Sequence, residues 1–176
     1  GELSGGIHSE ISSYLLIPPI FLFGFDLLSV KFPFILSGLG IVCLSYLLIK
    51  RLINERVGII AAFLSAVNPW SIHFSRSAYE SIFSAFFYLL GIYMMLNLKG
   101  WKILWSSLPL FLGFLSYFSA KTLLIPLSLS SFLIIKLFRP KDSLKPALIL
   151  NIIVLIFVLL YSLILVTTPA GGRFGE

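Results

Sequence analysis

The chain of 176 residues is 59% hydrophobic and only 11% charged, whereas soluble domains average roughly 45–50% apolar and about 25% charged residues. A water-soluble protein of this size could not bury so much apolar surface, because its surface-to-volume ratio limits its interior. The formal charge of +6 does not indicate nucleic-acid binding, because the basic residues stand in short clusters between apolar runs, as they do in membrane proteins.

Seven apolar segments follow one another between the charged residues. The first, Ile11 to Phe25, is short and contains Pro18-Pro19, so we expect an interfacial or re-entrant helix that begins near Pro19, where proline is tolerated best. The other six have lengths within the roughly 17–25 residues of a transmembrane helix. They are Phe32 to Ile49, Val57 to Phe74, Ser81 to Leu98, Ile103 to Ala120, Thr122 to Phe138 and Pro146 to Val166. The sequence therefore predicts an all-α, polytopic transmembrane helix bundle with about six spans, in which residues 1–176 form a single membrane domain.

The basic residues divide unevenly between the two sides of this predicted bundle. Those of one side are Lys50, Arg51, Arg56, Lys99, Lys102, Lys136, Arg139, Lys141 and Lys145. Those of the other side are Lys31, Arg76, Lys121 and Arg173. Cytoplasmic loops of membrane proteins carry an excess of lysine and arginine. The first side is therefore predicted to be cytoplasmic.

The few charges of the non-cytoplasmic side are candidates for function. Arg76 and Glu80 stand near the start of the fourth predicted segment, Lys121 joins the fifth to the sixth, and Arg173 follows the last. Charges close to the membrane are costly and often mark substrate paths. Lysine and arginine both bind phosphate, arginine through its bidentate fork. We therefore predict that these three cations converge on an anionic lipid headgroup.

Each of these residues also has a purely structural interpretation. Ser77 to Glu80 matches a capping box at a helix start, and Lys121 and Arg173 could extend to lipid phosphates as cations at helix ends do. His73 is more often an interfacial or packed histidine than a catalyst, although its side chain can exchange a proton near neutral pH. His8 and His73 lack partners at metal-ligand spacing, so no metal site and no cofactor are identified, while the sequence does not determine whether a divalent metal is required.

The run Asn68-Pro-Trp-Ser-Ile-His-Phe-Ser-Arg-Ser-Ala-Tyr-Glu-Ser81 closely resembles a loop of known membrane enzymes. It is similar to the loop between two spans of the protein O-mannosyltransferase-like (family 39-like) glycosyltransferases, within the C-type glycosyltransferase superfamily. Two further stretches agree: Ile17 to Pro33, where that group usually has arginine in place of Lys31, and Gly113 to Pro126 around Lys121.

This resemblance implies a multi-pass membrane enzyme, in the plasma membrane if the source is prokaryotic. It would transfer a sugar such as mannose from a polyprenyl- or dolichyl-phosphate carrier to a protein, lipid or glycan acceptor on the non-cytoplasmic side. Arg76, Lys121 and Arg173 would contact the carrier phosphate, with Glu80 and His73 in support. The catalytic acid of the group follows its first transmembrane helix. We expect it upstream of Gly1, in a longer protein of which this chain is an internal or N-terminally truncated part.

Two other function classes fit the same composition. A transporter or lipid flippase would be expected to show inverted repeats and broken helices around a site at the bilayer midplane, and neither is evident in the sequence. A non-catalytic membrane subunit that only binds such a lipid is the second alternative.

Overall fold

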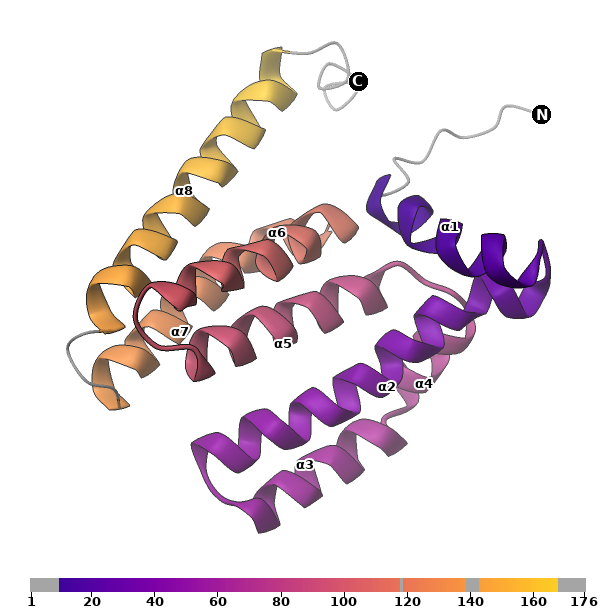
Figure 1. Ribbon diagram of the computed structural model, residues 1–176, viewed down its shortest axis with the longest axis horizontal. Coiled ribbons are helices and arrows are strands. Elements are labelled where there is room, and N and C mark those ends of the chain that lie inside the picture. Colours follow the sequence, from indigo (N-terminus) through magenta and orange to yellow (C-terminus); the bar gives the residue numbers. More distant parts are fainter. Residues whose placement is uncertain (1–9, 118, 139–142, 168–176) are drawn as a thin grey trace.

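The computed structural model describes residues 10–117, 119–138 and 143–167, and these residues form helices without a strand (Figure 1). The helices are α1 (Glu10–Phe23), α2 (Leu27–Leu52), α3 (Glu55–Val67), α4 (Pro69–Arg76), α5 (Ser81–Asn97), η1 (Gly100–Ser106), α6 (Ser107–Ser116), η2 (Ser119–Leu123), α7 (Leu124–Phe138) and α8 (Leu144–Thr167). The predicted all-α fold is confirmed. Arg173 lies outside the described residues.

Three helical segments of the described chain are long and apolar enough to cross a membrane. They are α2, the stretch Ser119–Leu137 formed by η2 and α7, and Leu144–Ile164 of α8. At about 1.5 Å per residue, the 26 residues of α2 measure about 39 Å, more than the roughly 30 Å of a bilayer core. The chain is therefore a membrane protein, while the total of six spans stays a prediction.

Helix α1 corrects the expected start of the first segment. It is one continuous helix of 14 residues with Pro18 and Pro19 in its interior, whereas we expected a helix beginning near Pro19. The cost of the two missing N–H donors is offset by tertiary contacts, because Leu15 and Leu16 pack beside Phe34 and Phe83. At about 21 Å, α1 is too short to cross the bilayer core, as predicted.

The predicted span Val57 to Phe74 is broken. Helices α3 and α4 meet at an angle of 51°, because Pro69 disfavours helical geometry at the residue before it. Asn68 accordingly has an extended backbone, and its side-chain Oδ1 accepts a hydrogen bond of 3.0 Å from the N–H of Trp70. The second half of the predicted span thus becomes the separate helix α4, which lies against α2.

The main helices run up and down, so alternate connections lie at the same end of the bundle (Figure 1). A buried group that we call the Leu150 cluster joins the end with the basic connections. Its members are Leu48, Met95, Leu96, Ile103, Ile135, Ala147 and Leu150, from the ends of α2, α5 and α7 and the starts of η1 and α8. The ends of α2, α5 and α7, near Lys50, Lys99 and Lys136, therefore meet at one end of the bundle, as the grouping of these three basic residues predicted.

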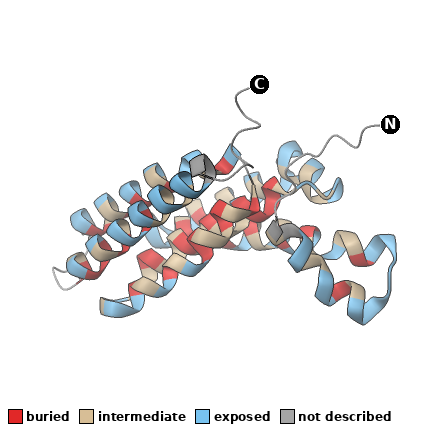
Figure 2. Cartoon of the chain, turned by 90° about the horizontal axis from the view of Figure 1, so that it is seen from above, coloured by how far each residue is buried: buried red, intermediate tan, exposed pale blue. Residues whose placement is uncertain are grey.

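Two further buried groups occupy the other half of the bundle. The Phe83 cluster comprises Phe34, Ile41, Ile82 and Phe83 of α2 and α5. The Phe114 cluster comprises Tyr88, Leu110, Phe114, Ala120, Leu124 and Val154. Outside these groups, many large apolar residues are exposed, and Figure 2 shows that exposed residues occur on helices throughout the bundle. Helix α3 buries only Gly58, so lipid is the solvent that its Ile60 and Phe63 require.

Candidate functional site

The short helix α4 ends in a Schellman motif directly after Arg76. Ala78 adopts the left-handed conformation with φ of 56°, and the N–H of Tyr79 donates a 3.1 Å hydrogen bond to the carbonyl of Phe74. The rings of Phe74 and Tyr79 pack with centroids 4.9 Å apart, which is the apolar contact that accompanies this motif. The left-handed position usually holds glycine, so the chain accepts local strain beside Arg76.

The predicted capping box is not formed. Ser77 closes α4 instead of opening α5, because its Oγ donates a 2.8 Å hydrogen bond to the carbonyl of His73. Helix α5 begins at Ser81, and Glu80 occupies its N-cap position with helical backbone angles and no capping hydrogen bond from its side chain. The left-handed turn at Ala78 separates Ser77 from the helix that it was expected to cap. The structural interpretation of Ser77 and Glu80 as a capping box is therefore wrong.

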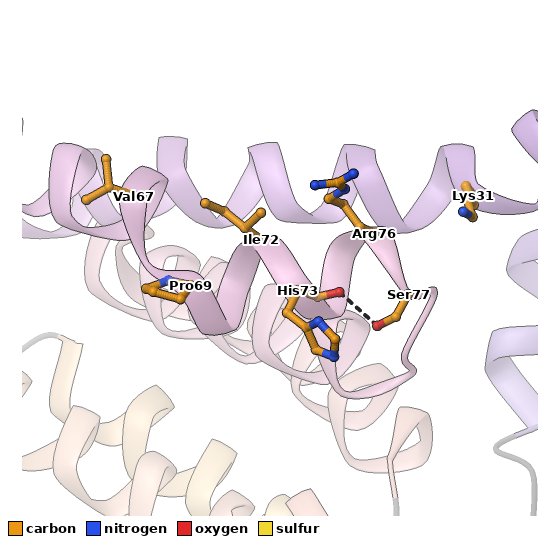
Figure 3. Close-up of a pocket in the computed structure, with 7 residues that line it drawn as sticks. All are labelled: Lys31, Val67, Pro69, Ile72, His73, Arg76 and Ser77. Carbon is orange, nitrogen blue, oxygen red and sulfur yellow. Dashed lines mark hydrogen bonds between the residues drawn. The ribbon is translucent and has the colours of Figure 1, made fainter.

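An open pocket of about 580 Å³ lies between α4 and the start of α2. Figure 3 shows its lining side chains, with Arg76 and His73 on α4 and Lys31 on α2. The complete lining is Lys31, Val67, Pro69, Ile72, His73, Arg76 and Ser77. Two cations and no carboxylate stand among these residues. The pocket can therefore attract an anion, which Arg76 can bind through its fork and Lys31 as a point charge.

The pocket depends on a close crossing of α2 and α4. Gly38 lies against Ser75, so that a Cβ atom on Gly38 would stand 3.0 Å from the Ser75 Cβ. This contact lets the helix carrying Arg76 approach the helix carrying Lys31. Sequence reasoning counted Lys31 on the same side of the membrane as Arg76 but did not include it in the site. The enzymes that the sequence resembles usually have arginine where Lys31 stands, and this shared positive charge was the signal that could have identified Lys31.

Lys121 does not line this pocket. Its ammonium group donates a hydrogen bond to the hydroxyl of Tyr161 on α8, and it lies 4.4 Å from the Tyr161 ring centroid and 5.7 Å from that of Phe114. The preceding carbonyl, of Ala120, accepts a buried 2.8 Å hydrogen bond from the hydroxyl of Tyr88. Lys121 thus stands in an aromatic corner where η2 meets α8, and its predicted contact with a carrier phosphate stays a prediction.

An aromatic contact joins the turn after α4 to the end of α6. The rings of Tyr79 and Tyr117 have centroids 5.9 Å apart at an angle of 64°. The neighbouring Tyr117 side chain raises the pKa of Tyr79 above its ordinary value, because it favours the protonated form of the Tyr79 hydroxyl. Sequence reasoning included neither tyrosine in the candidate site.

Comparison with known proteins identifies one family. A family model described as dolichyl-phosphate-mannose-protein mannosyltransferase matches residues 11–165. No curated protein and no solved structure matches the chain. The matched range includes nearly all of α1 and α8 and every helix between them, and therefore the whole pocket between α2 and α4.

Proposed function

The chain belongs to the dolichyl-phosphate-mannose-protein mannosyltransferase family, a family of membrane glycosyltransferases, and we propose that its open pocket binds the phosphate of a polyprenyl-phosphate sugar donor. The sugar, such as mannose, passes to a protein, lipid or glycan acceptor on the non-cytoplasmic side. One observation supports this proposal most strongly: Lys31 and Arg76 come from separate helices to one pocket without a carboxylate in its lining.

The chemistry of the transfer explains why such a pocket is useful. The bond between the sugar's anomeric carbon and the phosphate oxygen breaks, and the electron pair stays with the phosphate. The acceptor hydroxyl forms the new bond and loses its proton to a general base, which is usually a carboxylate. Lys31 and Arg76 would stabilise the negative charge that grows on the phosphate as the sugar leaves.

The position of the pocket also suits a lipid-linked donor. The pocket lies in the half of the bundle away from the basic connections. The positive-inside rule assigns those basic connections to the cytoplasm. The apolar tail of the carrier would stay in the bilayer, while its phosphate and sugar reach the opposite interface. We therefore propose that donor binding is the contribution of this part of the enzyme.

Substitution of Arg76 in the full-length membrane protein tests this function. Losing a hydrogen bond to a charged group costs roughly 1.5–3 kcal/mol, so Arg76→Ala should lower sugar transfer by about one to two decades. Arg76→Lys should restore only part of the rate, because an ammonium group lacks the bidentate fork. Lys31→Arg should be tolerated and Lys31→Ala should be impaired. Lys99→Ala, at the opposite end of the bundle, is the matched control and should leave transfer unchanged.

The proposal fails if Arg76→Ala, inserted at the normal level, keeps full turnover and an unchanged KM for the donor. Glu80→Gln then separates two roles of the neighbouring acid. A loss approaching that of Arg76→Ala would support the proposal that the charge of Glu80 orients Arg76. Near-normal transfer would limit Glu80 to the local structure of the turn.

A further inference from the structure

Helix α4 carries four of the side chains that line the pocket, yet the helix itself lies outside the buried core. It has only eight residues, and none of them is buried. Isolated helices shorter than about 12–15 residues are marginally stable. The position of Arg76 must therefore be fixed by contacts at the ends and along one side of α4.

The contact with α2 constrains only one side of this helix. The approach of Gly38 to Ser75 sets how near α4 lies to α2. A helix held along one line can still roll about it, which would move the Arg76 guanidinium relative to Lys31. Phe74 also packs on the Phe83 cluster of α2 and α5, so the last turn of α4 is the part still to be fixed. A second contact, on a different element, would set the direction in which Arg76 points.

A series of aromatic rings supplies that second contact. Trp70 and Phe74 pack with centroids 4.0 Å apart, Phe74 and Tyr79 at 4.9 Å, and Tyr79 and Tyr117 at 5.9 Å. The first two residues belong to α4, and Tyr117 caps the end of α6. The series therefore connects the first turn of α4 to the end of α6. Among the described residues, α4 and α6 share no other aromatic contact.

Tyr117 is itself well anchored. It packs on the Phe114 cluster, whereas Phe74 and Ala78 pack on the Phe83 cluster. The Tyr79–Tyr117 contact thus joins the two buried groups in the half of the bundle that contains the pocket. The left-handed backbone at Ala78 is the local cost of directing the Tyr79 ring toward Tyr117.

We propose that Tyr79 and Tyr117 are positioning residues for sugar transfer. Neither lines the pocket, and both act by holding the last turn of α4 so that Arg76 faces the donor phosphate. This inference rests on the proposed function, because it assigns the pair a role in the same donor site. Tyr117 acts through its ring, which packs against the ring of Tyr79.

A double-mutant cycle between Tyr117 and Arg76 tests this role. Aromatic pairs contribute about 0.5–1.5 kcal/mol, so Tyr117→Ala should lower kcat/KM for the donor roughly two- to tenfold, with no change in KM for the acceptor. Tyr117→Phe should recover most of the loss because it keeps the ring. In the Arg76→Ala background, Tyr117→Ala should have no further effect, because residues that act through one another are not additive.

Additive losses in the cycle would overturn the proposal, and so would an unchanged donor KM and kcat for Tyr117→Ala. Tyr14→Ala, an exposed tyrosine on α1, is the control for general effects of removing an aromatic ring and should match the unmodified enzyme. Full activity of Arg76→Ala alone would refute the proposed function. A large loss for Arg76→Ala, with additive behaviour of Tyr117→Ala, would refute only the positioning role.

Discussion

Gly38 of α2 and Ser75 of α4 approach so closely that a Cβ atom on Gly38 would lie 3.0 Å from the Ser75 Cβ and 3.5 Å from its Oγ. Real Cβ atoms seldom have neighbours this near, so the two backbones can meet only because one residue has no side chain. The consequence extends to the pocket, since Arg76 directly follows Ser75 and Lys31 lies two turns before Gly38 on the same helix face.

We expect Gly38→Ala to push α4 away from α2 and to reduce sugar transfer. Overpacking of this kind costs about 1–3 kcal/mol, which should lower the thermal midpoint of the detergent-solubilised protein. The added methyl group can be compensated, so Gly38→Ala combined with Ser75→Gly should recover part of both activity and stability. A Gly38→Ala protein with unchanged melting and turnover would show that the crossing tolerates a wider spacing.

At the left-handed residue Ala78 we expect a substitution to stabilise the protein, in contrast to Gly38→Ala. A left-handed conformation costs an L-residue roughly 1–2 kcal/mol, and glycine avoids this cost. Glycine also gives the unfolded chain more conformational entropy, which offsets part of the gain in stability. Ala78→Gly should therefore stabilise the protein by up to about 1 kcal/mol, measured by thermal unfolding. Ala61→Gly in the interior of α3 is the matched control and should destabilise by about 0.5–1 kcal/mol. Equal effects of both substitutions would contradict the backbone geometry at Ala78.

The aromatic corner around Lys121 allows its structural and functional roles to be separated. Tyr161→Phe removes the hydrogen bond but keeps the ring under the ammonium group, so we expect a small loss of thermal stability. Lys121→Met removes both contacts and should destabilise more. If Lys121 also contacts the donor phosphate, Lys121→Met should raise the donor KM while Tyr161→Phe leaves it unchanged. Equal donor KM values for the two variants would restrict Lys121 to holding η2 against α8.

Cysteine labelling in intact cells or sealed vesicles measures the predicted sidedness. The native Cys43 is exposed on α2 and is first replaced by alanine. A cysteine at Ser71 on α4 should react with a membrane-impermeant maleimide added from outside, whereas one at Lys99 should react only after permeabilisation. The reverse pattern would place the pocket on the cytoplasmic side and contradict the proposed site of transfer.

The sequence by itself determined the properties that depend on local composition. Apolar runs predict membrane helices wherever they occur, since the bilayer requires every backbone polar group to be hydrogen-bonded within the helix. The alternation of Lys50, Lys99 and Lys136 between apolar runs likewise placed their connections at one end of the bundle, where the Leu150 cluster joins them. The Asn68 to Ser81 run identified the family, because its residue order is specific.

Only the tertiary structure decided how the ends of these helices meet. Pro18 and Pro19 predicted a helix start, but the contacts of Leu15 and Leu16 with residues of α2 and α5 keep α1 continuous. The spacing of Ser77 and Glu80 fitted a capping box. In the structure, the left-handed turn at Ala78 follows Ser77, which therefore belongs to the end of α4.

The candidate site shows the same division. Arg76 could be selected from the sequence because it belongs to a recognisable motif. Its neighbour in the pocket, Lys31, is 45 positions away in the chain, and the contact of Tyr79 with Tyr117 joins residues 38 positions apart. Local patterns carry no information about which distant side chains meet. That pairing depends on how α2, α4 and α6 pack, and it is set by such details as the missing side chain of Gly38.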